Sequence, residues 1–173
     1  APAALCGVVG VKPTYGRVSR HGLVPLAWSM DHVGPMTRRV ADAAMLLNAM
    51  AGEDPRDPSS DPRPVPDYVG ALEERLDGVR VGVPIGYWFE GLEAAVDAAV
   101  RTALAVLEGL GARLVPVHLP SAGDLAAAGS LLSMWEAFGL HAASLRREGT
   151  SYGRKARAHI ASGGFHASAD VVH

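Results

Sequence analysis

The side chains in this sequence that could do chemistry are one cysteine, seven histidines and an acidic residue in an apolar loop. Cys6 lies among Leu and Val residues, where a thiol stays protonated and unreactive, so we interpret it as a buried structural residue. A single cysteine also excludes an internal disulfide and a cysteine-based zinc site. No histidine pair has the spacing of an H-E-x-x-H metal site. We therefore expect no metal and no cofactor.

The acidic residue is Asp31, in the segment "WSMDHVGPM", where Trp28, Met30 and Met36 flank it. A carboxylate in so apolar a loop has two interpretations. It can cap a turn by accepting hydrogen bonds from nearby backbone amides. Alternatively, it can line a ligand pocket beside an aromatic wall. We nominate Asp31 and Trp28 as substrate-binding residues and keep turn capping as the alternative for Asp31.

The elements that position this loop follow from hydrophobic periodicity. Residues 3–11, "AALCGVVGV", predict a short strand buried on both faces. A helix is predicted from Thr37, as N-cap, to Met50, with Gly52 ending it. Its apolar face consists of Val40, Ala43, Ala44 and Leu47.

The middle of the chain reads as an α/β fold. The Pro- and Asp-rich residues 53–66 predict an extended surface connection, and a short amphipathic helix is expected at 67–76. Residues 79–119 predict one βαβ unit: a strand at 79–84, a helix at 93–110 and a strand at 113–119. Its two strands should be parallel with a right-handed crossover.

The region from about residue 122 to residue 162 is expected to be helical, with a break near Gly149 and Gly153. With 173 residues, 49% hydrophobic and 20% charged, the composition is that of a folded protein. A net charge of −2 gives no electrostatic case for nucleic-acid or membrane binding by this segment. No apolar run is long enough to cross a bilayer. Without a recognisable export signal, a cytoplasmic location is expected.

The first 60 residues closely resemble the stretch that follows the active-site signature of the amidase signature family. The resemblance runs through "CGVVGVKPT", "YGRVS", "LVPLA", "D-x-VGP", "TRRVADAAMLLNAMAG" and "DPRDP". The segment Ala1-Pro2-Ala3 matches the last three positions of the signature. A looser similarity continues through "GVRVGVP" and "LGARLVPVHLP" to "WEAF". The family includes bacterial amidases and the A subunit of the glutamyl-tRNA amidotransferase.

The resemblance implies that residues 1–173 are part of the amidase signature fold, a mixed β-sheet flanked by helices. It also implies a Ser–cis-Ser–Lys mechanism, in which a neutral lysine accepts the proton of the nucleophilic serine through a bridging serine. All three residues precede Ala1 in the family's order, and a further C-terminal part follows His173. Lys12 and Lys155 do not match the catalytic lysine. We therefore expect no catalytic residue in this chain and no activity from the 173 residues alone.

The resemblance further implies a hydrolase acting on a small-molecule amide, because "MWEAFGLHAASLR" (134–146) is more similar to general amidases than to the transferase component. The alternatives are the A subunit of the glutamyl-tRNA amidotransferase, which hydrolyses glutamine, and a non-catalytic truncated remnant. A partial domain should also leave apolar surface uncovered and favour association, so a homo-oligomer is among the expected assembly states.

Overall fold

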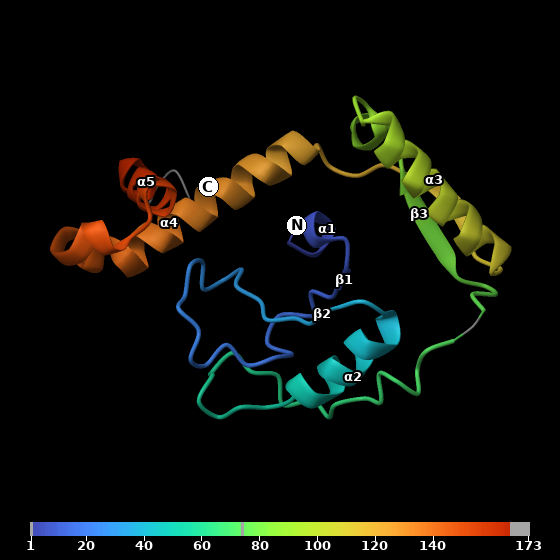
Figure 1. The fold of residues 1–173 in the computed structure, drawn as a ribbon, viewed down its shortest axis with the longest axis horizontal. Helices are drawn as coiled ribbons and strands as arrows, with labels where there is room; N and C mark the ends of the chain where they lie inside the picture. The colour runs from blue at the N-terminus through green and yellow to red at the C-terminus, as the bar shows by residue number, and fades with distance from the viewer. Residues whose placement is uncertain (1, 74, 167–173) are drawn as a thin grey trace. The chain divides into compact units, whose positions relative to one another are not determined.

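The computed structural model describes residues 2–73 and 75–166. These residues belong to two compact units, one formed by Ala1–Leu72 with Ser130–His173 and the other by Glu73–Gly129. The described residues contain both helices and strands, as the α/β class predicts (Figure 1).

The first element corrects the sequence prediction. Residues Pro2–Cys6 form helix α1, and only Val9–Gly10 form a strand, β1. Gly7 has a φ of 63° and ends the helix, while the amides of Val8 and Gly7 donate to the carbonyls of Ala3 and Ala4 at 3.0 and 3.3 Å. This is the Schellman pattern, which glycine permits because it carries no Cβ. Cys6 is exposed rather than buried, and no residue of α1 is buried.

The strand β1 pairs antiparallel with β2, Met36–Thr37, and places Gly10 opposite Met36. Helix α2 then spans Val40–Met50. It begins later than predicted: its N-cap is Arg39, and the Thr37 hydroxyl donates to the Arg39 carbonyl at 2.8 Å instead of capping an amide. The predicted face is buried at Ala43, Ala44 and Leu47, whereas Val40 is exposed.

The connection after α2 contains no regular element at residues 53–66, as predicted. The helix expected at 67–76 is absent from the described part of that range, where residues 68–71 form a turn. The Asp67 carboxylate accepts hydrogen bonds from the amides of Val69 and Gly70 at 3.0 and 2.9 Å. These bonds have the N-cap pattern, and the single turn that they begin is closed by the Ala71 amide, which donates to the Asp67 carbonyl at 3.1 Å.

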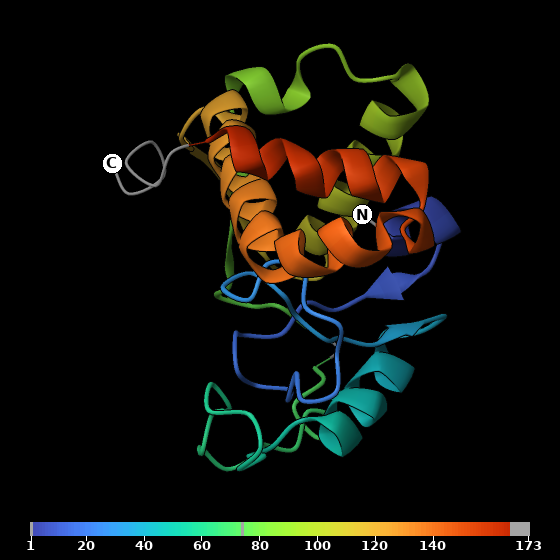
Figure 2. The same cartoon turned by 90° about the vertical axis from the view of Figure 1, so that its left-hand side faces the viewer.

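The C-terminal region is helical with the predicted break. Helix α4 spans Ala122–Glu148, the 3₁₀ turn η2 spans Gly149–Ser151, and helix α5 spans Arg154–Ser162, followed by η3 at Gly163–Phe165. Figure 2 shows α5 beside α4. The chain after α5 approaches α4 so closely that a Cβ on Gly163 would lie 1.9 Å from the Met134 carbonyl oxygen.

The second unit contains the predicted βαβ motif. Strands β3 (Arg80–Pro84) and β4 (Arg113–Val117) are parallel, with Gly82 opposite Val115, and helix α3 (Ala94–Gly109) connects them through a 3₁₀ turn, η1, at Gly86–Phe89. Figure 1 shows α3 running alongside this pair.

The buried apolar core of the described residues is small and contains mainly alanines. Many large apolar side chains are exposed, as expected for a partial domain; Leu5, Val24 and Phe165 are 88%, 84% and 89% exposed. None of the helices within residues 2–73 and 75–166 has the length and apolar character needed to span a membrane.

Candidate functional site

The nominated carboxylate is part of a tightly bonded turn. Asp31 accepts hydrogen bonds from the amides of Leu26 at 2.8 Å and Ala27 at 3.1 Å. The Ala27 carbonyl in turn accepts from the amides of Met30 and Asp31 at 2.8 and 2.7 Å. These bonds confirm the turn-capping interpretation of Asp31. A substrate-binding role for the same residue stays a prediction.

The nominated tryptophan lies at the edge of two pockets. The Trp28 side chain is 59% exposed. It lines a pocket of about 430 Å³ together with Trp135, Glu136 and Phe138, and also a smaller one of about 220 Å³ that includes Asp31. The structure therefore places the two nominated residues, which are three positions apart in the sequence, in the lining of the same smaller pocket.

The backbone of Trp28 is held from the side of the preceding loop. Its carbonyl oxygen accepts hydrogen bonds from the Tyr15 hydroxyl at 2.8 Å and from the Arg20 guanidinium. The Arg20 guanidinium also stacks on the Tyr15 ring, 4.5 Å from its centroid, in a cation–π contact. These two donors hold the backbone carbonyl of Trp28 in place, at the residue that lines both pockets.

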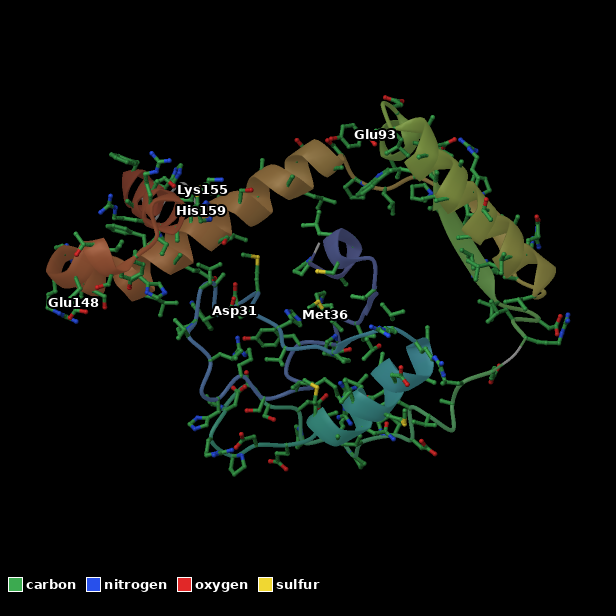
Figure 3. The ribbon with its side chains drawn as sticks, in the orientation of Figure 1. Asp31, Met36, Glu93, Glu148, Lys155 and His159 are labelled. Carbon is green, nitrogen blue, oxygen red and sulfur yellow. The ribbon has the colours of Figure 1, made fainter. Side chains whose placement is uncertain are left out.

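Helix α4 holds the same loop from the other side. The Glu136 carboxylate accepts hydrogen bonds from the Ser29 amide at 3.0 Å and the Ser29 hydroxyl at 2.5 Å. His141 lies on the same helix, with Nε2 2.6 Å from the Pro25 carbonyl oxygen. Figure 3 shows Asp31 and Met36 on the segment drawn between α4 and α2.

Sequence reasoning missed Glu136 and Ser29. The only signal was an acidic residue in the apolar run "SMWEAF", and nothing in the pattern links it to a serine 107 positions away. Glu136 is 7% exposed and lines the larger pocket. A buried carboxylate is stable only when hydrogen bonds compensate its lost hydration, and here the Ser29 donors do so.

The base of the loop is tied to the Pro- and Asp-rich segment. Asp57 accepts hydrogen bonds from the Ser59 hydroxyl and from the Arg20 amide, and these bonds lower the pKa of Asp57 to about 2. Asp61 is paired with Arg63, whose hydrogen bonds likewise lower the pKa of Asp61 to about 2. Both carboxylates therefore remain charged at neutral pH. Asp57 joins the segment to the loop through Arg20, whereas the Asp61–Arg63 pair lies within the segment.

Neither lysine has the buried environment that a lysine base requires. Lys12 is exposed, with its Nζ 3.3 Å from His32 Nε2. Lys155 is exposed on α5 (Figure 3). Both observations agree with the expectation that neither replaces the catalytic lysine.

A serine motif also lies in the chain without forming a nucleophile site. Residues 149–153, "GTSYG", have the G-x-S-x-G pattern of hydrolase nucleophiles. That pattern works at a sharp strand-to-helix turn, whereas Ser151 lies in η2 between two helices. The Tyr152 hydroxyl of this motif lies 3.0 Å from His141 Nδ1. The segment therefore contacts the α4 histidine that binds Pro25 in the loop of Trp28. Within the described ranges, no cluster of three His, Cys, Asp or Glu side chains could hold a metal ion.

Comparison with known proteins assigns the family. A family model described as Amidase matches residues 1–170, and the chain belongs to the amidase family. The curated relatives include the A subunit of the glutamyl-tRNA(Gln) amidotransferase of Anaeromyxobacter dehalogenans, which is 60% identical over 119 residues, covering 69% of this chain and 24% of that protein. The protein of the same name from Trichlorobacter lovleyi is 47% identical over 156 residues, covering 90% of this chain and 32% of the relative.

Solved structures confirm the amidase signature fold. A chain from a vestigial protein complex, described as revealing the evolutionary origins of an s-triazine catabolic enzyme, matches 99% of this chain with a TM-score of 0.89 and 33% identity. The A subunit of the Thermotoga maritima glutamyl-tRNA(Gln) amidotransferase matches 95% with a TM-score of 0.74 and 37% identity. This chain covers 36% and 35% of those two structures. It therefore spans between a quarter and a little over a third of the length of these four relatives.

Proposed function

We propose that the complete protein is a hydrolase of carboxamides and that this chain supplies the segment that follows its nucleophile. The observation that carries the proposal is the amidase family match over residues 1–170. In the family's mechanism, a serine upstream of Ala1 attacks the amide carbonyl, ammonia leaves, and water resolves the acyl-enzyme. A lysine, also upstream, accepts the serine proton through the bridging cis-serine.

In this proposal the chain's own contribution is substrate positioning. Trp28 presents an exposed aromatic face at two pockets, and the larger one has the volume of a small-molecule site. Asp31 and the donors to the Trp28 carbonyl hold the backbone that carries this side chain. The substrate is a small molecule that places its acyl part against Trp28. In this proposal the chain binds no nucleic acid, the protein acts in the cytoplasm, and a homo-oligomer is one of its proposed assembly states.

A second candidate is the glutamine-hydrolysing A subunit of a glutamyl-tRNA amidotransferase. The observation in its favour is the 60% identity over 119 residues to a protein of that name. In that case glutamine is the amide, and partner subunits replace the homo-oligomer. A non-catalytic remnant is the third candidate and predicts no turnover at all.

The test is ammonia release by the purified complete protein, supplied in turn with glutamine and with a panel of aliphatic and aromatic carboxamides. Release from the panel supports the general amidase, and release from glutamine alone supports the amidotransferase component. The 173-residue chain, assayed in parallel, is expected to release none. Turnover by that chain, or no ammonia from any amide with the complete protein, contradicts the proposal.

A further inference from the structure

Two side chains of α4 hold the two flanks of Trp28. Glu136 binds Ser29 on the C-terminal side through two hydrogen bonds, at 3.0 and 2.5 Å. His141 binds Pro25 on the N-terminal side, and because a carbonyl oxygen only accepts, His141 Nε2 carries the hydrogen of this 2.6 Å bond. Loops are ordinarily the mobile parts of a fold, so attachment at both flanks requires an explanation.

The amides of this loop are unusually well bonded. Those of Leu26 and Ala27 donate to Asp31, those of Met30 and Asp31 donate to Ala27, and that of Ser29 donates to Glu136. The turn formed by the first two sets is local and is closed by the loop's own residues. Among these amide bonds, that of Ser29 is the one that joins the turn to another element, α4.

The burial of the Glu136 carboxylate carries an unfavourable desolvation free energy, so stability alone does not explain a glutamate at this position. Glu136 is 7% exposed, and among the described residues no basic side chain forms a salt bridge with it. Buried charged groups are often replaceable by apolar residues of similar volume without loss of stability. A carboxylate does, however, specify direction, because it accepts an amide and a hydroxyl of the same residue at once.

We propose that Glu136 is a positioning residue that fixes the loop of Trp28 and Asp31 against α4, in the orientation that receives substrate. The substrate part of this inference rests on the proposed function. The chain of contacts runs from Glu136 through Ser29 to the neighbouring Trp28, whose side chain lines the same pocket as Glu136. The effect is preorganisation: the site does not have to order this loop when substrate binds.

The first measurement is amide hydrogen exchange in the complete protein, followed by mass spectrometry of peptides that cover residues 26–31. Glu136→Ala should accelerate exchange in these peptides by about tenfold or more, since it removes hydrogen bonds to a charged acceptor. Glu136→Gln should restore protection, because its carbonyl accepts the Ser29 amide and its NH₂ donates to the Ser29 hydroxyl. Glu148→Ala is the matched control, since Glu148 is an exposed glutamate on the same helix. Unchanged exchange in Glu136→Ala overturns the proposal.

The second measurement is steady-state kinetics of the same variants on an amide that the wild-type protein hydrolyses. Glu136→Ala should raise KM by about tenfold with a smaller effect on kcat, the result of a disordered binding loop and an intact nucleophile. Glu136→Gln should have a KM close to that of the wild type. An unchanged KM in Glu136→Ala, or equal damage in both variants, overturns the positioning role.

Two further arrangements keep the outcomes distinct. If Glu136→Ala fails to fold, Ser29→Ala removes only the hydroxyl bond, and the same exchange and KM increases, of smaller size, are expected. If the wild-type protein hydrolyses no amide, the proposed function fails, while faster exchange in Glu136→Ala and its rescue by Glu136→Gln still support fixation of the loop by Glu136.

Discussion

The backbone amide of Arg20 donates a 2.8 Å hydrogen bond to Asp57, and the Arg20 Nε lies 3.7 Å from the same carboxylate oxygen. The other oxygen of Asp57 accepts from the amide and hydroxyl of Ser59 at 3.0 and 2.6 Å. Arg20 in turn reaches the carbonyl of Trp28. One buried carboxylate thus connects the Pro- and Asp-rich segment to the loop that lines the candidate site.

This relationship predicts a pH dependence of stability. Hydrogen bonds from Ser59 and then Arg20 lower the pKa of Asp57 from 3.8 to about 2. Because the folded-state pKa lies below the unfolded one, the stabilisation is fully present above about pH 4 and is lost as the pH falls toward about 2.

The comparison of Asp57→Asn with the wild type in the complete protein tests this dependence. The difference in unfolding free energy between the two, measured by urea denaturation, should shrink between about pH 5 and about pH 2. Glu53→Gln, at an exposed position outside the helices and strands, is the control and should follow the wild-type profile. If the difference in unfolding free energy between the wild type and Asp57→Asn does not change with pH, the lowered pKa of Asp57 is contradicted.

The contribution of Asp31 to the site, by substrate contact or by shaping the loop, is testable by an isosteric change. Asp31→Asn turns one hydrogen-bond acceptor into an NH₂ group that faces the amides of Leu26 and Ala27. We expect a higher KM or a lower kcat for amide hydrolysis by the complete protein, with a change of about tenfold. Kinetics identical to those of the wild type would leave Asp31 with turn capping alone.

The contact between α4 and η3 predicts a steric effect. A Cβ on Gly163 would meet the Met134 carbonyl oxygen at 1.9 Å and Phe138 Cβ at 2.9 Å. Since backbone cannot yield as a side chain does, Gly163→Ala should lower the unfolding free energy by about 1–3 kcal/mol.

Gly129→Ala is the matched substitution, because Gly129 lies within α4 and its added Cβ would meet no atom within 4 Å. It should raise stability by roughly 0.5–1 kcal/mol, the difference in helix propensity between the two residues. Thermal denaturation of both variants measures the effects. Equal melting temperatures would show that the α4–η3 contact is looser than described.

The buried Arg17 predicts a difference between two cations. Its guanidinium donates to the Tyr68 hydroxyl at 3.0 Å and to the carbonyls of Arg63 and Pro64 at 2.8 and 2.9 Å. A lysine ammonium cannot reproduce this planar fork, so Arg17→Lys should cost about 1–3 kcal/mol of stability, measured by urea denaturation. Arg38→Lys, at an exposed position, should be neutral within roughly 0.5 kcal/mol. A neutral Arg17→Lys would mean that the fork contributes nothing to stability.

Much of the fold could be predicted from local patterns. The βαβ unit and the α4–α5 break were predicted because hydrophobic periodicity and glycine breakers act within one element. The errors have the same local origin. Residues 3–11 resemble a buried strand, but the first of them form α1, which ends at Gly7 in the left-handed region, and only Val9–Gly10 pair as β1. Thr37 resembles a cap, but it pairs in β2 instead.

The candidate site likewise has features that local sequence patterns predicted and features that they did not. The apolar setting of Asp31 and its neighbour Trp28 were visible in the sequence, as was the family resemblance, because both depend on contiguous residues. Glu136 and Ser29 are 107 positions apart, and only the packing of α4 on the loop brings the carboxylate to the serine. A hydrogen bond between such distant residues leaves no periodic trace in the sequence. Residue order therefore determined the family and the loop, and tertiary packing decided what holds that loop in place.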